Sequence, residues 1–202
     1  MAAPVKPPRP SYRQEQAEAT RMRIADAAQR LFAARGYGAT SMEAIAREAG
    51  VANRTVYASF GAKRHILSAI CERWLERADA RGLARTILDE PEATARLRGA
   101  ARWLTTLYST DFDVVRILDA ALDEDAETRD LLRAKLRGRN GVMDSLISSL
   151  EAQLSLPLGD AKAIYRAYAA PGVYGELVVD SGWPPERFQR WLADVLVAQL
   201  LS

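Results

Sequence analysis

Apolar residues recur at intervals of three and four along most of the chain, which is the spacing of one face of an α-helix. Residues 24–67 carry three such stripes in close succession. Their apolar members are Ile24, Ala27, Ala28, Leu31 and Phe32, then Met42, Ile45, Ala46 and Ala49, then Val56 and Phe60. Glycines separate the stripes, at Gly36 and Gly38 and again at Gly50, and glycine tolerates the left-handed turn after a helix end. The pattern predicts three successive helices, of which the last two are short.

Polar residues at the expected helix starts support these elements. Thr40 is followed three residues later by Glu43, which is the spacing of a capping box at the start of the second helix. Ser11 and Gln14 have the same spacing and predict a first helix over residues 12–35. Two short helices joined by a tight turn at a glycine are a helix-turn-helix candidate, whose second helix would enter the major groove of DNA.

The rest of the chain continues with helical periodicity and gives no convincing strand or internal repeat. Further helices are predicted over residues 61–80, 92–109, 112–122, 126–154, 160–180 and 185–201, which makes about nine in total. Gly82 and Pro91 flank a predicted break. Pro171 and Gly172 lie inside the last helix but one, and a proline there removes a ladder donor, so a kink or two half-helices are expected. The predicted fold class is all-α.

The distribution of charge along the chain indicates what kind of partner the protein binds. The net charge is +2, but residues 1–81 hold 14 Lys and Arg against 8 Asp and Glu, a balance of +6, and the remainder has a balance of −4. Positive charge therefore accompanies the predicted helix-turn-helix, as nucleic-acid binding requires. Residues 1–11 are rich in proline and are predicted to form a disordered basic tail, either solvated or laid along DNA as an arm.

Other chemistry is sparse. With one cysteine, Cys71, and one histidine, His65, the chain has no intramolecular disulfide, no His-based metal cluster and no triad partner set. No carboxylate pair sits on a recognisable catalytic frame, so we predict no catalytic residue, no metal, no cofactor and no enzyme activity. No apolar run approaches the length of a membrane span, and no signal-peptide core is present, so a cytoplasmic protein without a membrane partner is expected.

The run of residues 24–67 resembles the DNA-binding domain of the tetracycline-repressor (TetR) family of bacterial transcription regulators. The matching elements are Ala28, Leu31, Phe32, Gly36, Tyr37, Thr40, Ser41, Met42, Ile45, Ala46, Ala49, Gly50, Val51, Thr55, Val56, Tyr57, Phe60, Lys63 and Leu67. The remaining helices match only loosely. Ala52 departs from the pattern, because the family usually carries a small hydroxyl residue there as helix N-cap, and Asn53 is the alternative cap.

The resemblance makes residues 53–60 the recognition helix. The residues expected to contact DNA are Thr40, Ser41, Asn53, Arg54, Thr55, Tyr57, Ala58, Ser59 and Lys63. Arg54 and Asn53 suit base edges, because each side chain can make bidentate hydrogen bonds to a base. The other polar side chains suit phosphates, which fix the register without reading the sequence. The charge of Lys63 opposes the dipole of its helix, and a nearby phosphate would offset that cost.

The second half offers a set of mostly aromatic side chains that could line a ligand pocket between helices. These are Trp103, Leu107, Tyr108, Phe112, Asp119, Met143, Tyr165, Tyr168 and Tyr174. Members of the family bind inducers in this part of the chain. The alternative is that these residues fill the core. The expected ligand is largely apolar, with hydrogen-bonding groups met by tyrosine hydroxyls, and a cationic ligand is less favoured although Asp119 leaves it open.

The resemblance also implies a homodimer, with a DNA-binding head over residues 12–68 and a ligand-binding and dimerising body over residues 69–202. The residues predicted at the dimer interface are Tyr174, Leu177, Phe188, Trp191, Leu192, Val195 and Leu196, and which of them face the partner is open. The expected function is repression at a near-palindromic operator with release by a small molecule. The alternatives are an all-α enzyme or small-molecule-binding protein with an incidental helix-turn-helix, and a DNA-architectural protein without a ligand.

Overall fold

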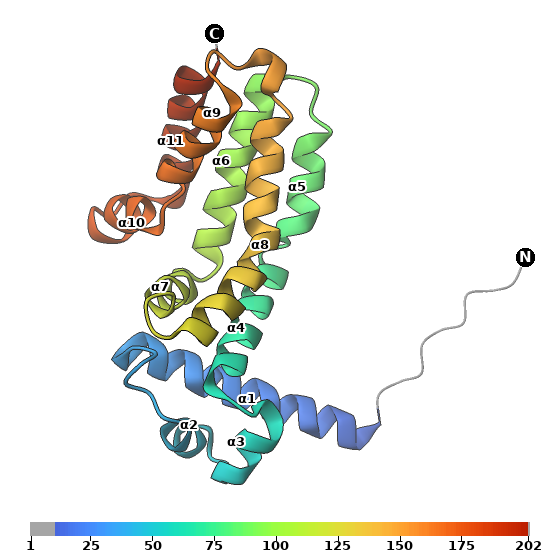
Figure 1. Cartoon of the computed structure of the whole chain (residues 1–202), viewed down its shortest axis with the longest axis vertical. Coiled ribbons are helices and arrows are strands. Elements are labelled where there is room, and N and C mark those ends of the chain that lie inside the picture. The colour runs from blue at the N-terminus through green and yellow to red at the C-terminus, as the bar shows by residue number, and fades with distance from the viewer. Residues whose placement is uncertain (1–10, 202) are drawn as a thin grey trace, which may run out of the picture. The chain divides into compact units, whose positions relative to one another are not determined.

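The fold is all-α, as the periodicity predicted (Figure 1). The structure is a computed structural model and describes residues 11–201, so the tail predicted over residues 1–11 lies, apart from Ser11, outside the described residues. The α-helices are α1 Tyr12–Arg35, α2 Met42–Ala49, α3 Asn53–Phe60, α4 Lys63–Arg77, α5 Ala80–Leu88, α6 Ala93–Thr110, α7 Phe112–Ala121, α8 Ala126–Ser148, α9 Leu158–Tyr168, α10 Pro171–Tyr174 and α11 Pro185–Leu200. A 3₁₀ turn, η1 Glu151–Gln153, and a π-helical turn, η2 Gly175–Asp180, complete the set.

The chain divides into two compact units, Met1–Leu67 and Ser68–Ser202, and the boundary falls inside α4. We call residues 11–67 the head and residues 68–201 the body. Over residues 11–201, none of the helices combines the length and the apolar content needed to cross a lipid bilayer.

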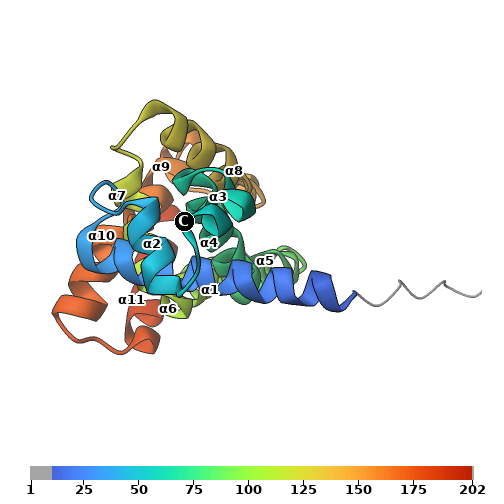
Figure 2. The same ribbon diagram turned by 90° about the horizontal axis from the view of Figure 1, so that it is seen from below.

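The head is built on the apolar face of α1, with α2 packed on α1 and α3 packed on α2 (Figure 2). Its buried side chains are Ile24, Ala27, Ala28, Leu31, Phe32, Met42, Ile45, Val56 and Phe60, which are the stripes of the sequence pattern. Helix α1 begins at the predicted capping box, with Ser11 and Gln14 each bonded to the other's backbone. Gly36 and Gly50 end α1 and α2 with φ of +86° and +64°, the left-handed region that glycine favours.

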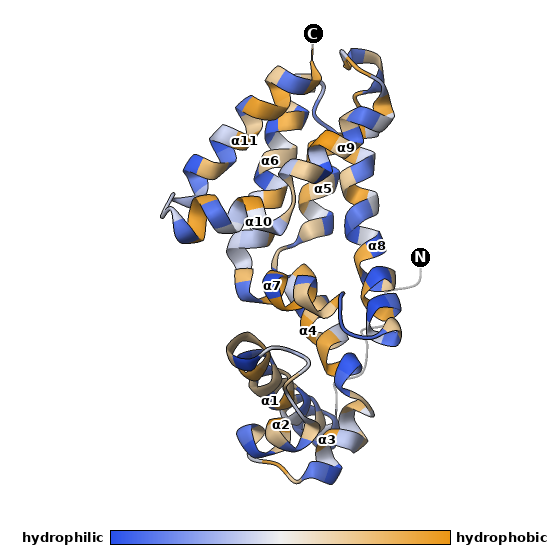
Figure 3. Ribbon diagram, turned by 60° about the vertical axis from the view of Figure 1, so that its left-hand side comes forward, coloured by the Kyte–Doolittle hydropathy of each residue, from blue (hydrophilic) through white to orange (hydrophobic). Residues whose placement is uncertain are grey.

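The body is organised around α6. Helices α5, α7, α8 and α11 all pack against it, and α9 covers α8 and α11. Hydrophobic and hydrophilic residues alternate along α8 and α11, so each helix presents a mixed outer face (Figure 3). On α6 itself, one wide face is buried, through Leu97, Gly99, Ala100, Ala101, Trp103, Leu104, Leu107 and Tyr108.

The sequence pattern misplaced one element of the body. The break predicted between Gly82 and Pro91 is instead mostly helix α5, and α4 ends earlier than expected. Asp79 occupies the junction with φ of +44°, and its carboxylate accepts a hydrogen bond from the Gly82 amide at 3.3 Å. Gly82 therefore lies in the first turn of a helix that Asp79 caps, and the predicted total of about nine helices is too low.

Of the two predictions for residues 126–180, one placed a helix end wrongly and the other is confirmed. The helix predicted over residues 126–154 ends at Ser148 and is followed by the turn η1. The interruption at Pro171 is confirmed, because α9 stops at Tyr168 and the chain continues through the short α10 into the π-helical turn η2. Such π-helical turns replace the usual ladder of hydrogen bonds with a wider one, and they often lie at functional sites.

Candidate nucleic-acid interface

The helix-turn-helix forms as predicted, but with different caps. Helix α2 begins at Ser41, whose hydroxyl oxygen accepts a hydrogen bond from the Ala44 amide at 3.1 Å, so the predicted cap at Thr40 is wrong. Helix α3 begins at Asn53 after Ala52, which provides no side-chain cap, so Asn53 does not take over that role either. The Asn53 amide instead donates to the Glu43 carboxylate at 3.3 Å and ties α3 to α2.

The outer face of α3 carries most of the residues predicted to contact DNA. Asn53, Arg54, Tyr57 and Ala58 are exposed, and Thr55 and Ser59 are half-buried. Tyr57 has 47% of its surface exposed, which is a large share for an aromatic side chain on so short a helix. The opposite face, Val56 and Phe60, is buried in the head. An exposed face with one guanidinium, one amide and one phenol is suited to reading base edges and holding phosphates.

One carboxylate lies at the edge of this face. Hydrogen bonds from the Glu43 backbone amide, then from Ser41 and Asn53, lower the pKa of Glu43. Glu43 therefore stays ionised at neutral pH and accepts a hydrogen bond from the Asn53 side-chain amide. Its negative charge would repel the phosphates that this surface is expected to meet. We therefore assign Glu43 the role of orienting Asn53 and not that of contacting DNA.

Two arginines of α1 hold the helix-turn-helix from behind. The Arg21 guanidinium donates to the Ser59 carbonyl and lies 4.2 Å from the centroid of the Phe60 ring. Arg23 donates to the carbonyls of Ala49 at 3.1 Å and Gly50 at 3.5 Å. Both cations therefore sit at helix C-termini, where the helix dipole favours positive charge. Sequence reasoning missed these roles, because their partners lie 26–38 residues away along the chain.

Lys63 does not point outward as the phosphate assignment required. Its ammonium donates to the carbonyls of Tyr37 at 2.7 Å, Thr40 at 3.0 Å and Gly38 at 3.4 Å, and it lies 4.2 Å above the Tyr37 ring. Three acceptors match the three donors of an ammonium group. We therefore correct the prediction, because Lys63 closes the loop between α1 and α2 from inside the head.

Thr40 is corrected in the same way. Only 2% of its surface is exposed, its hydroxyl donates to the Gly36 carbonyl at 2.8 Å, and its amide donates to the Tyr37 carbonyl at 3.2 Å. Both of its donors are used within the head and cannot meet a phosphate in this conformation. Ser41, next to it, is exposed, and its hydroxyl donates to the Glu43 carboxylate while accepting from the Ala44 amide.

Known proteins contain domains similar to this one. Residues 24–70 match the family model described as bacterial regulatory proteins, tetR family. The DNA-binding domain of this chain belongs to that family. Over 55 residues it is 44% identical to the HTH-type transcriptional regulator SrpR of Pseudomonas putida, an alignment that covers 27% of this chain and 26% of the relative.

Solved structures extend the likeness to the whole fold of this tetR-family regulator. FadR of Bacillus subtilis, solved in complex with stearoyl-CoA, is 20% identical with a TM-score of 0.72, over 88% of this chain and 97% of FadR. NalD, the secondary repressor of the MexAB-OprM multidrug efflux pump of Pseudomonas aeruginosa, is 22% identical with a TM-score of 0.66, over 92% of this chain and 98% of NalD. At these identities the likeness shows the fold, and the helix-turn-helix identifies a DNA-binding transcription regulator.

Most of the predicted ligand residues of this tetR-family protein lie in its core. Those fully or nearly fully buried are Trp103, Leu107, Tyr108, Met143, Tyr165 and Tyr174. The Trp103 indole donates to the Ala80 carbonyl at 2.7 Å, the Tyr165 hydroxyl donates to the Ala100 carbonyl at 3.1 Å, and the Tyr108 hydroxyl donates to the Ala169 carbonyl. Burial raises the pKa of Tyr108 to about 12. The prediction that tyrosine hydroxyls meet the ligand is therefore wrong for Tyr108 and Tyr165, whose donors are already used.

Three of the cavities among the body helices bear on this prediction. An outer cavity of about 380 Å³ lies between α4, α5, α6 and α8 and is lined by Trp103 and Arg139 among others. An inner cavity of about 50 Å³ is lined mainly by apolar side chains of α4, α7 and α8. A third cavity, of about 400 Å³, lies between α7, α10 and η2 and is lined by Phe112 and Asp119, the two predicted ligand residues with side chains at its wall. Tyr168 lies elsewhere, half-buried, with its ring centroid 6.0 Å from that of Trp191.

The predicted dimer residues divide into two groups. Tyr174, Phe188, Leu192 and Leu196 are buried within a single chain, because this side of α11 packs along α6, and their assignment to the interface is therefore wrong. Leu177, Trp191 and Val195 are half-buried and lie on η2 and the outer side of α11. Near them, Val179 leaves 52% of its surface exposed.

Proposed function

We propose that this regulator is a homodimeric repressor that occupies a near-palindromic operator and is released by a small molecule bound in the body. The exposed face of α3 carries the proposal, because Asn53, Arg54 and Tyr57 are exposed while the half-buried Arg21 holds the end of the helix from the other side. The fold likeness to NalD, a repressor, and to FadR, solved with stearoyl-CoA, supports repression and ligand response.

The operator can be found by selecting duplexes from a random library with the full chain. A near-palindromic consensus with two half-sites is expected, because a two-fold dimer presents two recognition helices about 34–36 Å apart or at a multiple of that spacing. Enrichment without any consensus would favour the alternative of a DNA-architectural protein. Titration of a labelled operator with candidate effectors then tests release.

Arg54 is expected to read one base in each half-site. Arg54→Ala should cost about 1–3 kcal/mol in each half-site of the selected operator and relax the preference at one position of that half-site. The matched control is Arg85→Ala, because Arg85 is an exposed arginine on α5 of the body and its loss changes the net charge equally. Repeating the selection with each variant checks the prediction. A consensus unchanged by Arg54→Ala would show that another residue reads that base.

The dimer is proposed to form through the outer side of α11 with η2, where Leu177, Trp191 and Val195 remain half-exposed. A self-complementary interface of this kind joins the same patch on both subunits. Sedimentation velocity at micromolar concentration should give twice the chain mass of 22.3 kDa. Val195→Asp should shift the protein to a monomer by placing a charge in the interface, and Thr86→Asp, on the exposed side of α5, should leave the dimer intact. A monomeric parent protein would rule out this assembly.

A further inference from the structure

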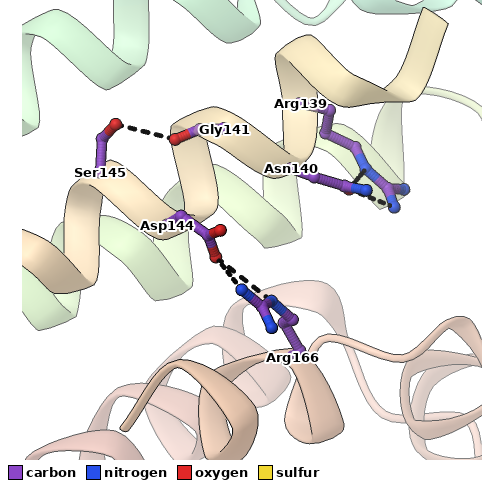
Figure 4. Close-up of polar contacts among 6 residues, drawn as sticks. All are labelled: Arg139, Asn140, Gly141, Asp144, Ser145 and Arg166. Carbon is purple, nitrogen blue, oxygen red and sulfur yellow. Dashed lines mark hydrogen bonds and ion pairs between the residues drawn. The ribbon is translucent and has the colours of Figure 1, made fainter. Parts of the chain in front are cut away.

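Arg139 of α8 is a half-buried arginine of the body that has no acidic partner. Its Nε and Nη2 atoms donate to the Asn140 side-chain oxygen at 3.2 and 3.1 Å (Figure 4). Within residues 11–201, no carboxylate lies within ion-pair distance of it. Two nearby charges on the same helix are paired, since Asp144 pairs with Arg166 at 2.6 Å and Lys135 pairs with Glu72. Arg139 differs from Arg133 and Arg137 of α8, which are also unpaired in the described part of the chain, because it is half-buried, whereas they are exposed.

Arg139 lies where two cavities meet. It lines both the outer cavity and the inner cavity. The inner cavity is otherwise mostly apolar, with walls from Trp74, Val115, Leu118, Leu122, Leu136 and Pro171, and its one carboxylate is Asp119. In the outer cavity the acidic groups are Glu72, Glu76 and Asp79, of which Glu72 is paired. The guanidinium therefore faces an aqueous opening on one side and an apolar recess on the other.

The field of this charge reaches into the core of the body. Burial raises the pKa of Cys71 to about 11 and of Tyr108 to about 12, and the positive charge of Arg139 opposes the rise at both sites. Arg139 is itself half-buried, and a partly desolvated charge without a counterion is less stable than a paired one. A carboxylate can offset that cost, because the guanidinium fork binds it through two parallel hydrogen bonds.

We propose that the body binds an amphipathic carboxylate, with its carboxylate held by Arg139 and its hydrocarbon chain in the outer cavity of about 380 Å³, beside Leu75, Trp103 and Val142. Only its role as the releasing effector rests on the proposed function. The inner cavity, of about 50 Å³, is too small for such a chain, and Asp119 in its wall repels an anion. A ligand anchored at Arg139 in the outer cavity contacts α4, α5, α6 and α8 together. Because α4 continues into the head, such a ligand could influence DNA binding.

The test uses three probes that share one alkyl chain: octanoate, octanol and octyltrimethylammonium. Calorimetric titration of the full chain without DNA should show octanoate binding at least about tenfold more tightly than octanol, or about 1.4 kcal/mol. Arg139→Met keeps the length of the side chain and removes its charge, so it should abolish this preference. Arg137→Met, at an exposed arginine of the same helix, should retain it.

Several results would overturn the proposal. The first is equal binding of octanoate and octanol by the parent chain, and the second is no binding of octanoate. The third is a preference for the ammonium probe, which would assign the charge selection to the carboxylates of the outer cavity. The fourth is an unchanged preference in Arg139→Met. Since these titrations contain no DNA, they are independent of repression. If octanoate binds but does not change the affinity for the operator, the carboxylate site is supported. That result would contradict the idea that this class of molecule releases the protein from DNA.

Discussion

Phe188→Ala is expected to lower the free energy of unfolding by about 3–5 kcal/mol, because it empties a filled position in the core. Phe188 has 0% of its surface exposed, and its ring centroid lies 4.9 Å from that of Tyr174 and 5.8 Å from that of Trp191. It stands where α11 packs along α6, so the surrounding helices cannot collapse into the space without moving. Urea denaturation followed by circular dichroism measures the loss.

The same substitution separates core from interface. Leu88→Ala, at an exposed leucine of α5 outside the proposed interface, is the control and should cost less free energy of unfolding. If Phe188 faced a partner chain, Phe188→Ala would weaken the dimer and leave the fold of each subunit stable. A variant that dissociates on dilution yet keeps the parent's free energy of unfolding would therefore contradict the assignment of Phe188 to the core of one chain.

The sequence was informative wherever structure follows from local spacing. The periodic apolar residues and the Ser11 capping box predicted α1 with its observed bounds, and Pro171 predicted the interruption of the helix that begins near residue 160. The residues of the helix-turn-helix were also recognisable, since its glycines and apolar stripes lie within a few residues of each other. In each case the deciding interactions connect residues about three or four apart, which is the range that a sequence pattern reports.

Distant contacts explain what the pattern missed. Gly82 resembles a helix stop, but Asp79, in a left-handed conformation, caps a further helix, α5, at that point. The Ala80 carbonyl in its first turn accepts a hydrogen bond from the Trp103 indole of α6. The sequence pattern showed that one face of α11 is apolar. It did not show whether that face packs on the chain's own α6 or on a partner chain, because either packing would bury the same residues. The unpaired charge of Arg139 was likewise hidden, since an arginine in a helical pattern is normally solvated.

Lys63→Met is expected to lower the stability of the head by about 1.5–3 kcal/mol, the usual range for hydrogen bonds to a charged group. The variant keeps an apolar chain of similar length beside Tyr37 but leaves three carbonyls of residues 37–40 without their shared donor. Hydrogen exchange of the full chain should show faster exchange at amides of α1–α3, while protection in the body changes little. The charge-retaining Lys63→Arg is the matched variant and should lose part of the same stability, because a planar fork cannot converge on three carbonyls as an ammonium group does.

The salt dependence of DNA binding decides between the two roles of this lysine. A residue that neutralises one phosphate contributes about 0.9 to the slope of log affinity against log salt concentration, because it releases a bound counterion. If Lys63 is held by the head, the slope for Lys63→Met should equal that of the parent chain, and any loss of affinity should track the loss of head stability. Anisotropy titrations on the selected operator at several salt concentrations, at a temperature where the head of the variant is folded, measure the slope. Because the proposed dimer carries Lys63 twice, a slope reduced by about twice that amount, with unchanged exchange rates in the head, would return Lys63 to the phosphate backbone. That result would mean that the three hydrogen bonds of Lys63 within the head break when DNA is bound.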